Sequence, residues 1–369
     1  MFKKIAFIAS YSLPLIIVLA YYLPNQPITW TGAFYVYVLV PLIDILIGKD
    51  RQNVVKEEFD KLLSDSYFDF LVFSHIYIQY AMLTWVSYVL VYDDLTTTQA
   101  VRLVISQGIY AGTIINVSHE LGHRNTFWSK LHARLGLVSV AYHHFIVEHN
   151  KGHHVHVATP KDPATSKFGQ TLYGFWFQSI IGSFLSAWEI EKQRLNKKRQ
   201  GVLSFKNEVL MGVFSSILLF VTITLLFSII KGAFAFEVLY FLLGQSAVAI
   251  LLLEAVNYIE HYGIVRQEIN PGKYERVNPL HSWNANHFYS NLLLFNLQRH
   301  SDHHAYASRP YQILRHFDES PQLPFGYPLM IVISLFPFLW FKVMNPRLIK
   351  WKENAYDASH IKKVVAQFV

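Results

Sequence analysis

The stretch His149-Asn150-Lys151-Gly152-His153-His154 guides the interpretation of the whole chain, because half of its residues are histidines. Three other segments add histidines: two in 119–123 (HELGH), one in 257–263 (NYIEHYG) and three in 300–304 (HSDHH). Residues three and four apart lie one above the other on a helix, so His119 and His123 can present two imidazoles to one ion. Four such segments, far apart in sequence, predict a polynuclear metal site that folding assembles.

The number of histidines predicts two metal ions. The four segments hold nine of the 18 histidines of the chain. One ion seldom takes more than about six ligands, and neutral imidazole suits iron, copper, zinc and nickel. A single HExxH pair is usually an ordinary surface or core feature, so the prediction depends on the four segments together.

The composition is that of a membrane protein. The 369 residues are 52% hydrophobic and 15% charged, whereas charged residues make up about 25% of a soluble domain. The net charge of +7 is therefore assigned to membrane orientation, and no nucleic-acid-binding motif is present. The absence of cysteine excludes disulfides, iron–sulfur clusters and an in-chain rubredoxin centre. Electrons for redox chemistry must then come from a separate protein.

Six segments are apolar over the roughly 20 residues that cross a bilayer. We expect spans at about 5–23, 28–48, 68–92, 100–118, 208–230 and 236–259, the first being retained rather than cleaved. The segment 133–147 is expected to form a helix beneath the membrane domain, 327–341 an interfacial or re-entrant segment, and the tail after Pro346 a helical appendage. The chain is predicted to be an all-α membrane protein with one integrated domain over residues 1–369.

Charged loops predict the orientation. Lysines and arginines gather in 49–61 and 192–206, whereas the connections 23–27 and 93–99 have none. The positive-inside rule then places both termini and a catalytic cap, residues 119–207 and 260–369, in the cytoplasm. The histidine segments would lie at the cytoplasmic ends of spans. This placement favours an enzyme over a metal transporter, whose ligands lie near the bilayer midplane.

Beyond the histidines, the motifs resemble those of the integral-membrane alkane 1-monooxygenases, members of the membrane di-iron hydroxylases and desaturases. The resemblance covers nearly the whole chain and rests on residues 119–123, 148–154, 158–164 (ATPKDPA), 257–263 and 297–305 (LQRHSDHHA). The last stretch places the chain nearer the alkane enzymes than the xylene hydroxylases or desaturases. Two departures are Arg124, where a lysine is usual and which we expect to be exposed, and Glu254, where an uncharged residue is expected.

The resemblance implies an enzyme that hydroxylates the terminal methyl group of medium- or long-chain n-alkanes. O₂ would be the co-substrate, and a rubredoxin, fed by its reductase, would supply two electrons. The resemblance also implies a di-iron centre, and its nine ligands would be His119, His123, His149, His153, His154, His261, His300, His303 and His304. The alkane would arrive from the lipid of a bacterial cytoplasmic (inner) membrane.

Carboxylates next to the ligands are candidates for orienting the second ring nitrogen of each imidazole. They are Glu120, Glu148, Asp162, Glu260 and Asp302. A surface salt bridge is the alternative for each, and the position of Asp302 between two ligands favours a functional role. His281 and His287 are expected to form hydrogen bonds rather than to bind metal. The remaining histidines are interpreted as ordinary residues: His75, His132, His143, His144, His156, His316 and His360.

Several alternatives remain open. Gly108 and Gly112, on the helix face of His119, indicate either a substrate tunnel or, preferably, a close-packing surface for another span. Asp44 and Glu254 would either line a water path or lock helices together. Competing functions are hydroxylation of another apolar methyl group (a xylene side chain or a fatty acyl ω-carbon), desaturation, metal carriage or sensing, and zinc-dependent proteolysis with Glu120 as base, which needs only three ligands.

Overall fold

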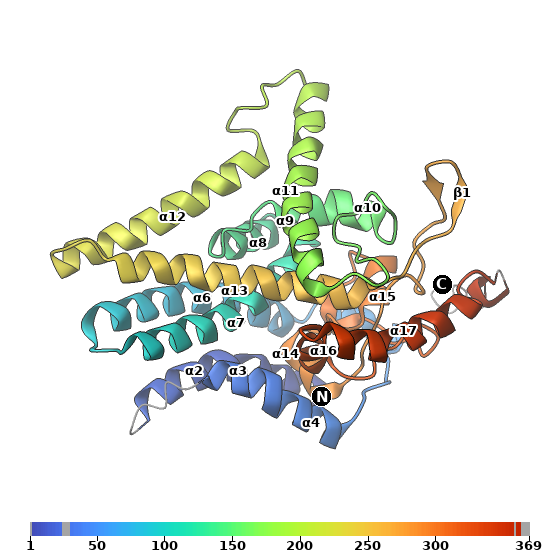
Figure 1. The fold of residues 1–369 in the computed structure, drawn as a ribbon, viewed down its shortest axis with the longest axis horizontal. Helices are drawn as coiled ribbons and strands as arrows, with labels where there is room; N and C mark the ends of the chain where they lie inside the picture. The colour runs from blue at the N-terminus through green and yellow to red at the C-terminus, as the bar shows by residue number, and fades with distance from the viewer. Residues whose placement is uncertain (1, 24–29, 358, 363–369) are drawn as a thin grey trace. The chain divides into compact units, whose positions relative to one another are not determined.

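The computed structural model describes residues 2–23, 30–357 and 359–362, and these are mostly helical (Figure 1). The elements in chain order are α1 (Phe2–Ala6), η1 (Phe7–Tyr11), α2 (Ser12–Tyr22), α3 (Thr31–Phe34), η2 (Tyr35–Leu39), α4 (Val40–Ile47), η3 (Lys56–Glu58), α5 (Phe59–Leu63), α6 (Ser66–Tyr92), α7 (Thr97–Gly122), α8 (Phe127–Val138), α9 (Phe145–Glu148), η4 (His149–His153), α10 (His154–His156), α11 (Leu172–Lys197), α12 (Glu208–Lys231), α13 (Phe236–His261), β1 (Glu268–Asn270), β2 (Lys273–Tyr274), α14 (Phe288–Leu293), α15 (His300–Ala305), η5 (Tyr311–Ile313), α16 (Tyr327–Ser334) and α17 (Pro337–Asn354). The two strands form one short antiparallel hairpin, which the all-α prediction did not include.

Within the described residues, five helical stretches are long and apolar enough to cross a membrane: Lys3–Tyr22, α6, α7, α12 and α13. The chain is therefore an integral membrane protein. The predicted second span differs from the structure. Its first residues, 28 and 29, lie outside the described residues, and the rest forms the shorter apolar stretch Thr31–Ile47. Pro41 lacks an N–H and its ring crowds the carbonyl of Tyr37, and the helix widens into the π-helical turn η2 around that residue.

Polar side chains determine where the long helices begin. Asp65 accepts a hydrogen bond from the backbone N–H of Tyr67 at the start of α6, and Thr96 and Gln99 form a capping box at the start of α7. The side chain of Asn207 accepts hydrogen bonds from backbone N–H groups in the first turn of α12. At the other end of α12, Gly232 forms the C-cap in the left-handed conformation, with a φ of 74°. These residues satisfy N–H groups that have no partner within the helix. The apolar segments are thereby delimited much as the sequence predicts.

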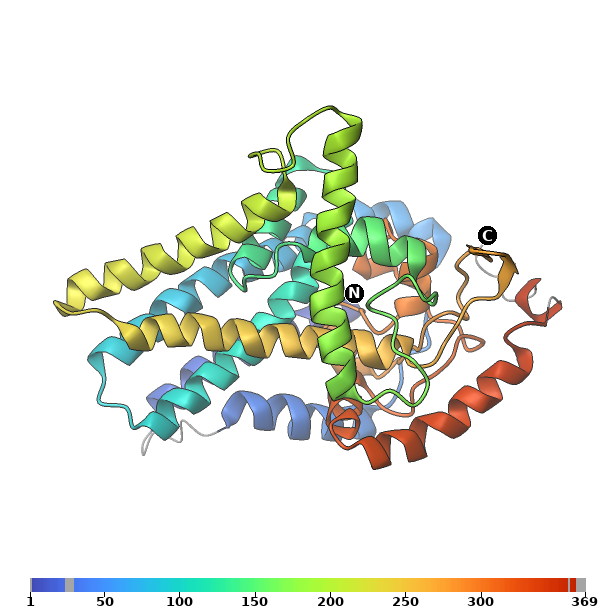
Figure 2. The same cartoon turned by 45° about the horizontal axis from the view of Figure 1, so that its top comes forward.

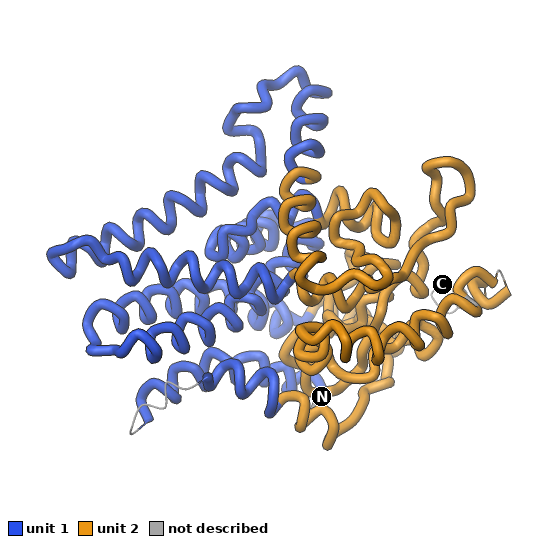
Figure 3. Tube along the Cα trace, in the orientation of Figure 1, with its two compact units in different colours: residues 1–39, 65–148, 187–253 blue, residues 40–64, 149–186, 254–369 orange. Residues whose placement is uncertain are grey.

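The chain folds into two compact units, each built from segments far apart in sequence (Figure 3). Unit 1 comprises residues 1–39, 65–148 and 187–253. In unit 1, α6 and α7 lie side by side (Figure 1), and α8 packs against both. Amide side chains link three of its helices: Gln107 donates to Gln79 at 3.0 Å, and Gln79 donates to Gln245 at 3.5 Å. Buried amides of this kind join helices within a bilayer.

Glycines on α7 permit close helix packing in unit 1. A Cβ added at Gly108 would lie 2.5 Å from Cβ of Val248 on α13, and one at Gly112 would lie 3.5 Å from Leu252. The preferred interpretation of these glycines as a close-packing surface is confirmed, because the neighbouring helix occupies the space next to them.

Unit 2 comprises residues 40–64, 149–186 and 254–369 and holds seven of the nine predicted ligands. Its apolar core includes Tyr258, Tyr262, Trp283 and Trp340, all fully or nearly fully buried. Trp283 joins the end of α13 to the loop before α14, because its backbone N–H donates to the carbonyl of Glu260 and its indole N–H donates to that of Tyr262. These two hydrogen bonds hold the end of α13, where His261 lies, against the apolar core of unit 2.

The two carboxylates expected in spans lock segments of unit 2 together. Oδ1 of Asp44 on α4 accepts hydrogen bonds at 3.0 Å from the backbone N–H groups of Tyr289 and Ser290, in the first turn of α14. Glu254 on α13 accepts from the hydroxyl of Ser179 on α11 and from the amide of Asn257, the latter at 3.1 Å. The helix-locking interpretation therefore describes both carboxylates.

Three predicted segments differ from the structure or are refined by it. The prediction of one helix over 133–147 is wrong. The chain turns at Ala141, which has a φ of 53°, so α8 ends at Val138 and α9 begins at Phe145. The long helix α11 was not anticipated from the sequence. Residues 327–341 form no single span but divide between α16 and α17, and α17 continues through Pro346 as the expected helical tail.

We expect Gly108→Ala to lower the thermal stability of the purified protein in detergent and Gly112→Ala to leave it unchanged or raised. Both substitutions gain about 1 kcal/mol of helix propensity, but only the Cβ at Gly108 would overlap Val248, and such overpacking costs about 1–3 kcal/mol. The fraction of monodisperse protein left after heating, measured by size-exclusion chromatography, gives the two midpoints. Equal shifts in the two variants would contradict the packing argument.

Candidate metal centre

Four buried imidazoles in unit 2 face one another. The Nε2 atom of His300 lies 3.3 Å from that of His261 and 2.9 Å from that of His304, and the Nε2 atoms of His153 and His304 are 3.3 Å apart. His300 and His304 are one turn apart on α15, whereas His261 ends α13 and His153 ends η4. The ligand atoms of all four lie within 4.8 Å of one another. Three separate elements thus bring four nitrogens to one point.

The spacing of these nitrogens fits a shared metal ion. Two imidazole nitrogens bound to one ion at about 2.1 Å, and separated by about 90–110° at the ion, are roughly 3.0–3.4 Å apart. The nearest Nε2 pairs in the four-histidine group are 2.9–3.3 Å apart. Burial, and then the neighbouring His300, lower the pKa of His304 well below its ordinary value. The ring is therefore neutral and offers a lone pair, which is the form of imidazole that binds a metal.

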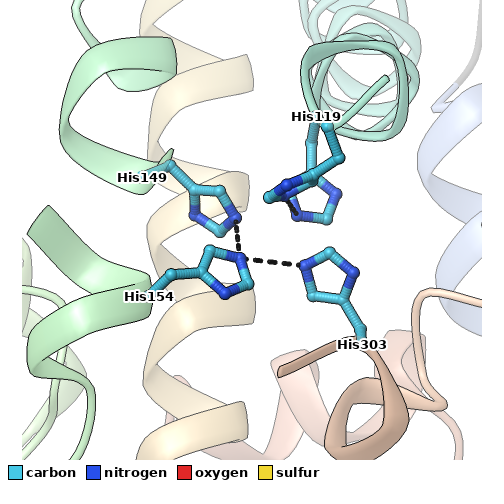
Figure 4. A group of neighbouring side chains, drawn as sticks. His119, His149, His154 and His303 are labelled. Atoms are coloured by element: carbon cyan, nitrogen blue, oxygen red, sulfur yellow. Dashed lines mark hydrogen bonds between the residues drawn. The ribbon is translucent and has the colours of Figure 1, made fainter. Parts of the chain in front are cut away.

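A second group in unit 2 consists of His149, His154 and His303. The Nε2 atom of His154 lies 3.0 Å from that of His149 and 3.2 Å from that of His303 (Figure 4). Figure 4 shows the three rings pointing toward one another from η4, α10 and α15. The ligand atoms of these residues also lie within 4.8 Å of one another. This group offers a second set of imidazole nitrogens for an ion.

A π-helical turn decides which histidines share a group. In an α-helix His149 would face His153, four residues later, but η4 is a π-helix, whose wider turn pairs residues five apart. His149 therefore faces His154, and His153 joins the other group. On α15 the one-turn pair His300 and His304 stays together, while His303 faces the group of His149.

In unit 1, His119 and His123 end α7, and their Nε2 atoms are 3.2 Å apart. Glu120 accepts hydrogen bonds from Arg124, which also donates to Asp69 at 2.6 Å. The expectation that Arg124 is exposed was wrong, because these carboxylates hold its side chain at 13% exposure. Arg124 stabilises the last turn of α7, where the two histidines lie.

The candidate carboxylates of unit 2 have different surroundings. Nδ1 of His153 donates to Oδ2 of Asp162 at 2.9 Å, and this carboxylate also accepts from Thr165 and from a backbone N–H. Such a contact fixes the tautomer that leaves Nε2 free for a metal. Oε2 of Glu260 instead lies 3.3 Å from Nε2 of His300, the nitrogen that faces the other rings.

Asp302 and Glu148 are both buried. Asp302 accepts hydrogen bonds from the guanidinium of Arg309 at 2.5 Å and from the backbone N–H of Arg315 at 2.9 Å. It thereby anchors α15, which carries three of the histidines, to the segment that follows. Any support that Asp302 gives to the ligands acts through this anchoring. Glu148 is the last residue of α9 and directly precedes His149 in the sequence.

Histidines that were expected outside the ligand set mostly have ordinary surroundings. Nε2 of His281 lies 3.3 Å from Glu275, and its Nδ1 accepts from the backbone N–H of Asn278. Burial lowers the pKa of His287 to about 4 at the start of α14. His143 is the exception, because its ring lines a separate cavity. No motif in the sequence distinguishes His143 from its neighbour His144 or from the other histidines outside the ligand set.

The chain is similar to known membrane-enzyme families. Residues 97–334 match the family model described as fatty acid desaturase. The chain is 40% identical over 365 residues to an alkane 1-monooxygenase of Acinetobacter baylyi. This alignment covers 97% of the chain and 88% of the relative. The chain is 39% identical over 356 residues to that of Ectopseudomonas oleovorans (95% and 86%). Similarity to the xylene/toluene monooxygenase hydroxylase component of Pseudomonas putida is weaker, 28% over 244 residues (64% and 61%).

We expect Asp162→Asn to weaken metal binding by about 10–100-fold, because an amide no longer accepts the Nδ1 proton of His153 with a full negative charge. Chelator competition followed by elemental analysis measures the affinity. Asp318→Asn is the matched control, since Asp318 contacts the non-ligand His316 and is 63% exposed. The assignment of Asp162 fails if both variants retain metal equally.

Proposed function

Because this chain belongs to the alkane 1-monooxygenase family, we propose that it hydroxylates the terminal methyl group of medium- and long-chain n-alkanes to primary alcohols. It is a membrane di-iron monooxygenase, as its relatives indicate. The observation that supports the proposal most directly is the gathering of buried, mutually facing imidazole nitrogens in unit 2. O₂ would be the co-substrate, and one of its oxygen atoms would enter the alcohol.

In this proposal two iron ions are held by nine histidines. Within unit 2, His153, His261, His300 and His304 would hold one ion, and His149, His154 and His303 would bind the second. Bound iron would supply the oxidising power that an unactivated C–H bond requires and that no acid, base or nucleophile of the protein has. Neutral imidazoles bind the ions without adding negative charge, unlike the carboxylates of soluble di-iron bundles.

The protein's own residues orient the ligands and exclude water. Asp162 would hold the proton on Nδ1 of His153, so that Nε2 stays available as a donor. His261 and His153 are at most 1% exposed, and the core of Tyr258, Trp283 and Trp340 lies beside the end of α13. A dry site protects a reactive oxidant from water. The alkane would reach the site from the lipid.

We propose that the electron donor is a separate protein, because the given sequence has no cysteine to bind a rubredoxin iron. We propose that the donor is a rubredoxin reduced by its reductase. A cavity of about 610 Å³ in unit 2 supports this, because its lining includes Asp162, which contacts His153. Lys161, Lys167 and Lys352 also line it, so its charge is complementary to an acidic protein surface.

The proposal keeps the predicted membrane topology and location. Six spans, with Thr31–Ile47 contributing the second, would leave both termini and the segments 119–207 and 260–369 in the cytoplasm of a bacterium, as one integrated domain. The arrangement gives a soluble electron donor access to the histidines from the cytoplasmic side, and gives the alkane access from the bilayer.

Product analysis tests the proposed reaction. Purified protein supplied with n-octane or n-hexadecane, O₂ and reduced rubredoxin is expected to form the 1-alkanol. Xylene, fatty acids and acyl chains in the same assay distinguish the alternative hydroxylase and desaturase functions by their products. Oxygen uptake without alcohol, or tightly held zinc without oxygen uptake, would contradict the proposal, and the latter would favour a metal carrier or sensor.

His303→Ala is expected to reduce iron from about two ions per chain toward one and to abolish alkanol formation, because it removes a nitrogen from the group of His149 and His154. Iron content by mass spectrometry and alkanol yield by gas chromatography are the measurements. His360→Ala is the control, since His360 lies in the C-terminal tail, and it should keep both values. Unchanged iron in His303→Ala would remove His303 from the ligand set.

Replacing Lys161 and Lys167 by glutamate is expected to raise the KM for reduced rubredoxin by about tenfold and to leave turnover with a small chemical reductant unchanged. The reversed charge repels an acidic partner, whereas neither lysine contacts the imidazole groups in the described part of the chain. Lys197→Glu/Lys273→Glu, at two exposed lysines that do not line this cavity, controls for the same change in net charge. An equal rise of KM in the control would place the donor elsewhere.

A further inference from the structure

A second cavity, of about 670 Å³, lies within unit 1 at the beginning of α12. Figure 2 shows that the chain reaches this point from α11 through the connection 198–207. The cavity has apolar walls from α8 and α12, which include Leu135, Val138 and Met211. Its charged lining consists of four cationic residues, Arg134, Arg194, Lys198 and Lys206, and one carboxylate, Glu208. We propose that it binds one anionic phospholipid, whose phosphate lies among these cations.

The cavity has positive charge that its own carboxylates do not balance. Arg134 donates to Glu208 at 2.8 Å, and Arg194 forms two hydrogen bonds of 2.7 Å with Glu191. In the described part of the chain Lys198 and Lys206 have no carboxylate partner. Two positive charges therefore remain for a ligand, and the lysine ammonium groups can donate to phosphate oxygens.

His143 adds a buried polar group to the cavity. The side chain is 7% exposed, and its Nδ1 atom has no hydrogen-bond partner within the described residues. The ring packs against Gly212, where an added Cβ would lie 2.2 Å from Nδ1. Burial, and then Arg134, lower the pKa of His143 to about 4. The neutral ring keeps one N–H, and a phosphate or glycerol oxygen in the cavity would be an acceptor for it.

The surroundings of the cavity favour a lipid over a soluble phosphate. α12 is a candidate span in which only 22% of the most apolar window is buried. Large apolar side chains such as Phe214, Ile217 and Leu218 are more than half exposed along it. In the preceding connection, Leu203 and Phe205 are 81% and 85% exposed. Acyl chains can lie along α12 while the headgroup stays near the lysines, which is the usual level of lipid phosphates next to a span.

Spin-labelled lipids provide the test on the full-length protein in detergent micelles. The fraction of labelled phosphatidylglycerol that is motionally restricted by the protein is compared with that of labelled phosphatidylcholine. We expect phosphatidylglycerol to bind at least about tenfold more tightly, because two lysines near a membrane surface attract an anionic headgroup. Excess glycerol 3-phosphate is added in a parallel arm and should not displace it.

Two variants probe the site itself. The double variant Lys198→Gln/Lys206→Gln removes the unbalanced charge and should abolish the preference for phosphatidylglycerol. Ser215→Phe fills the cavity beside Gly212 without changing the charge and should weaken binding of both lipids. The matched control Lys130→Gln/Lys197→Gln removes two exposed charges of unit 1 that do not line the cavity, and it should bind as the original protein does.

Elution volume and helical circular dichroism show whether each variant is folded, and Ser215→Phe serves as the second test where the double lysine variant does not fold. The proposal is wrong if the control loses the preference as strongly as Lys198→Gln/Lys206→Gln, because the effect would then be general surface charge. Displacement by glycerol 3-phosphate alone would also overturn it, since the site would then bind soluble phosphate. Equal binding of both lipids by the original protein would have the same consequence.

Discussion

The structure depends on holding largely buried imidazole nitrogens face to face. Rings whose lone pairs converge at about 3 Å gain nothing from one another unless a cation lies between them. The backbone that carries the rings must therefore be fixed by contacts that do not involve the rings. In unit 2 the end of α13 is held by Trp283, and α15 is anchored by Asp302 through its arginine partners.

A buried arginine shows how strongly α15 is held. Arg299 immediately precedes this helix and is among the largest fully buried side chains. Its guanidinium donates to the carbonyl of Leu314 at 2.7 Å and to the carboxylate of Asp50 at 3.2 Å. Both partners belong to irregular segments, which would otherwise have few constraints. The rigid fork of a guanidinium suits this role, because it binds several acceptors in a fixed geometry.

The helices of unit 1 make the kinds of contact that hold helices together within a bilayer. Its helices are joined by buried amides and by glycines that allow close approach, rather than by a driving force for apolar association. α12, which has few buried side chains, is the helix most suited to contact lipid directly. The cationic cavity lies at the first turn of α12, where charged and apolar side chains meet as they do at a membrane surface.

The sequence by itself determined five of the long spans and the histidines that could bind metal, because these depend on local composition and spacing. Glu254 could be placed in a helix, but its partner Ser179 could not be predicted, since the two are 75 residues apart. Arg124 was expected to be exposed because its carboxylate partner Asp69 lies on another helix. Only the tertiary structure decided that His149 faces His154 rather than His153. The physical reason is that a π-helical turn and contacts between distant segments set the directions of these side chains. The spacing of residues along the sequence indicates neither the π-helical turn nor those contacts.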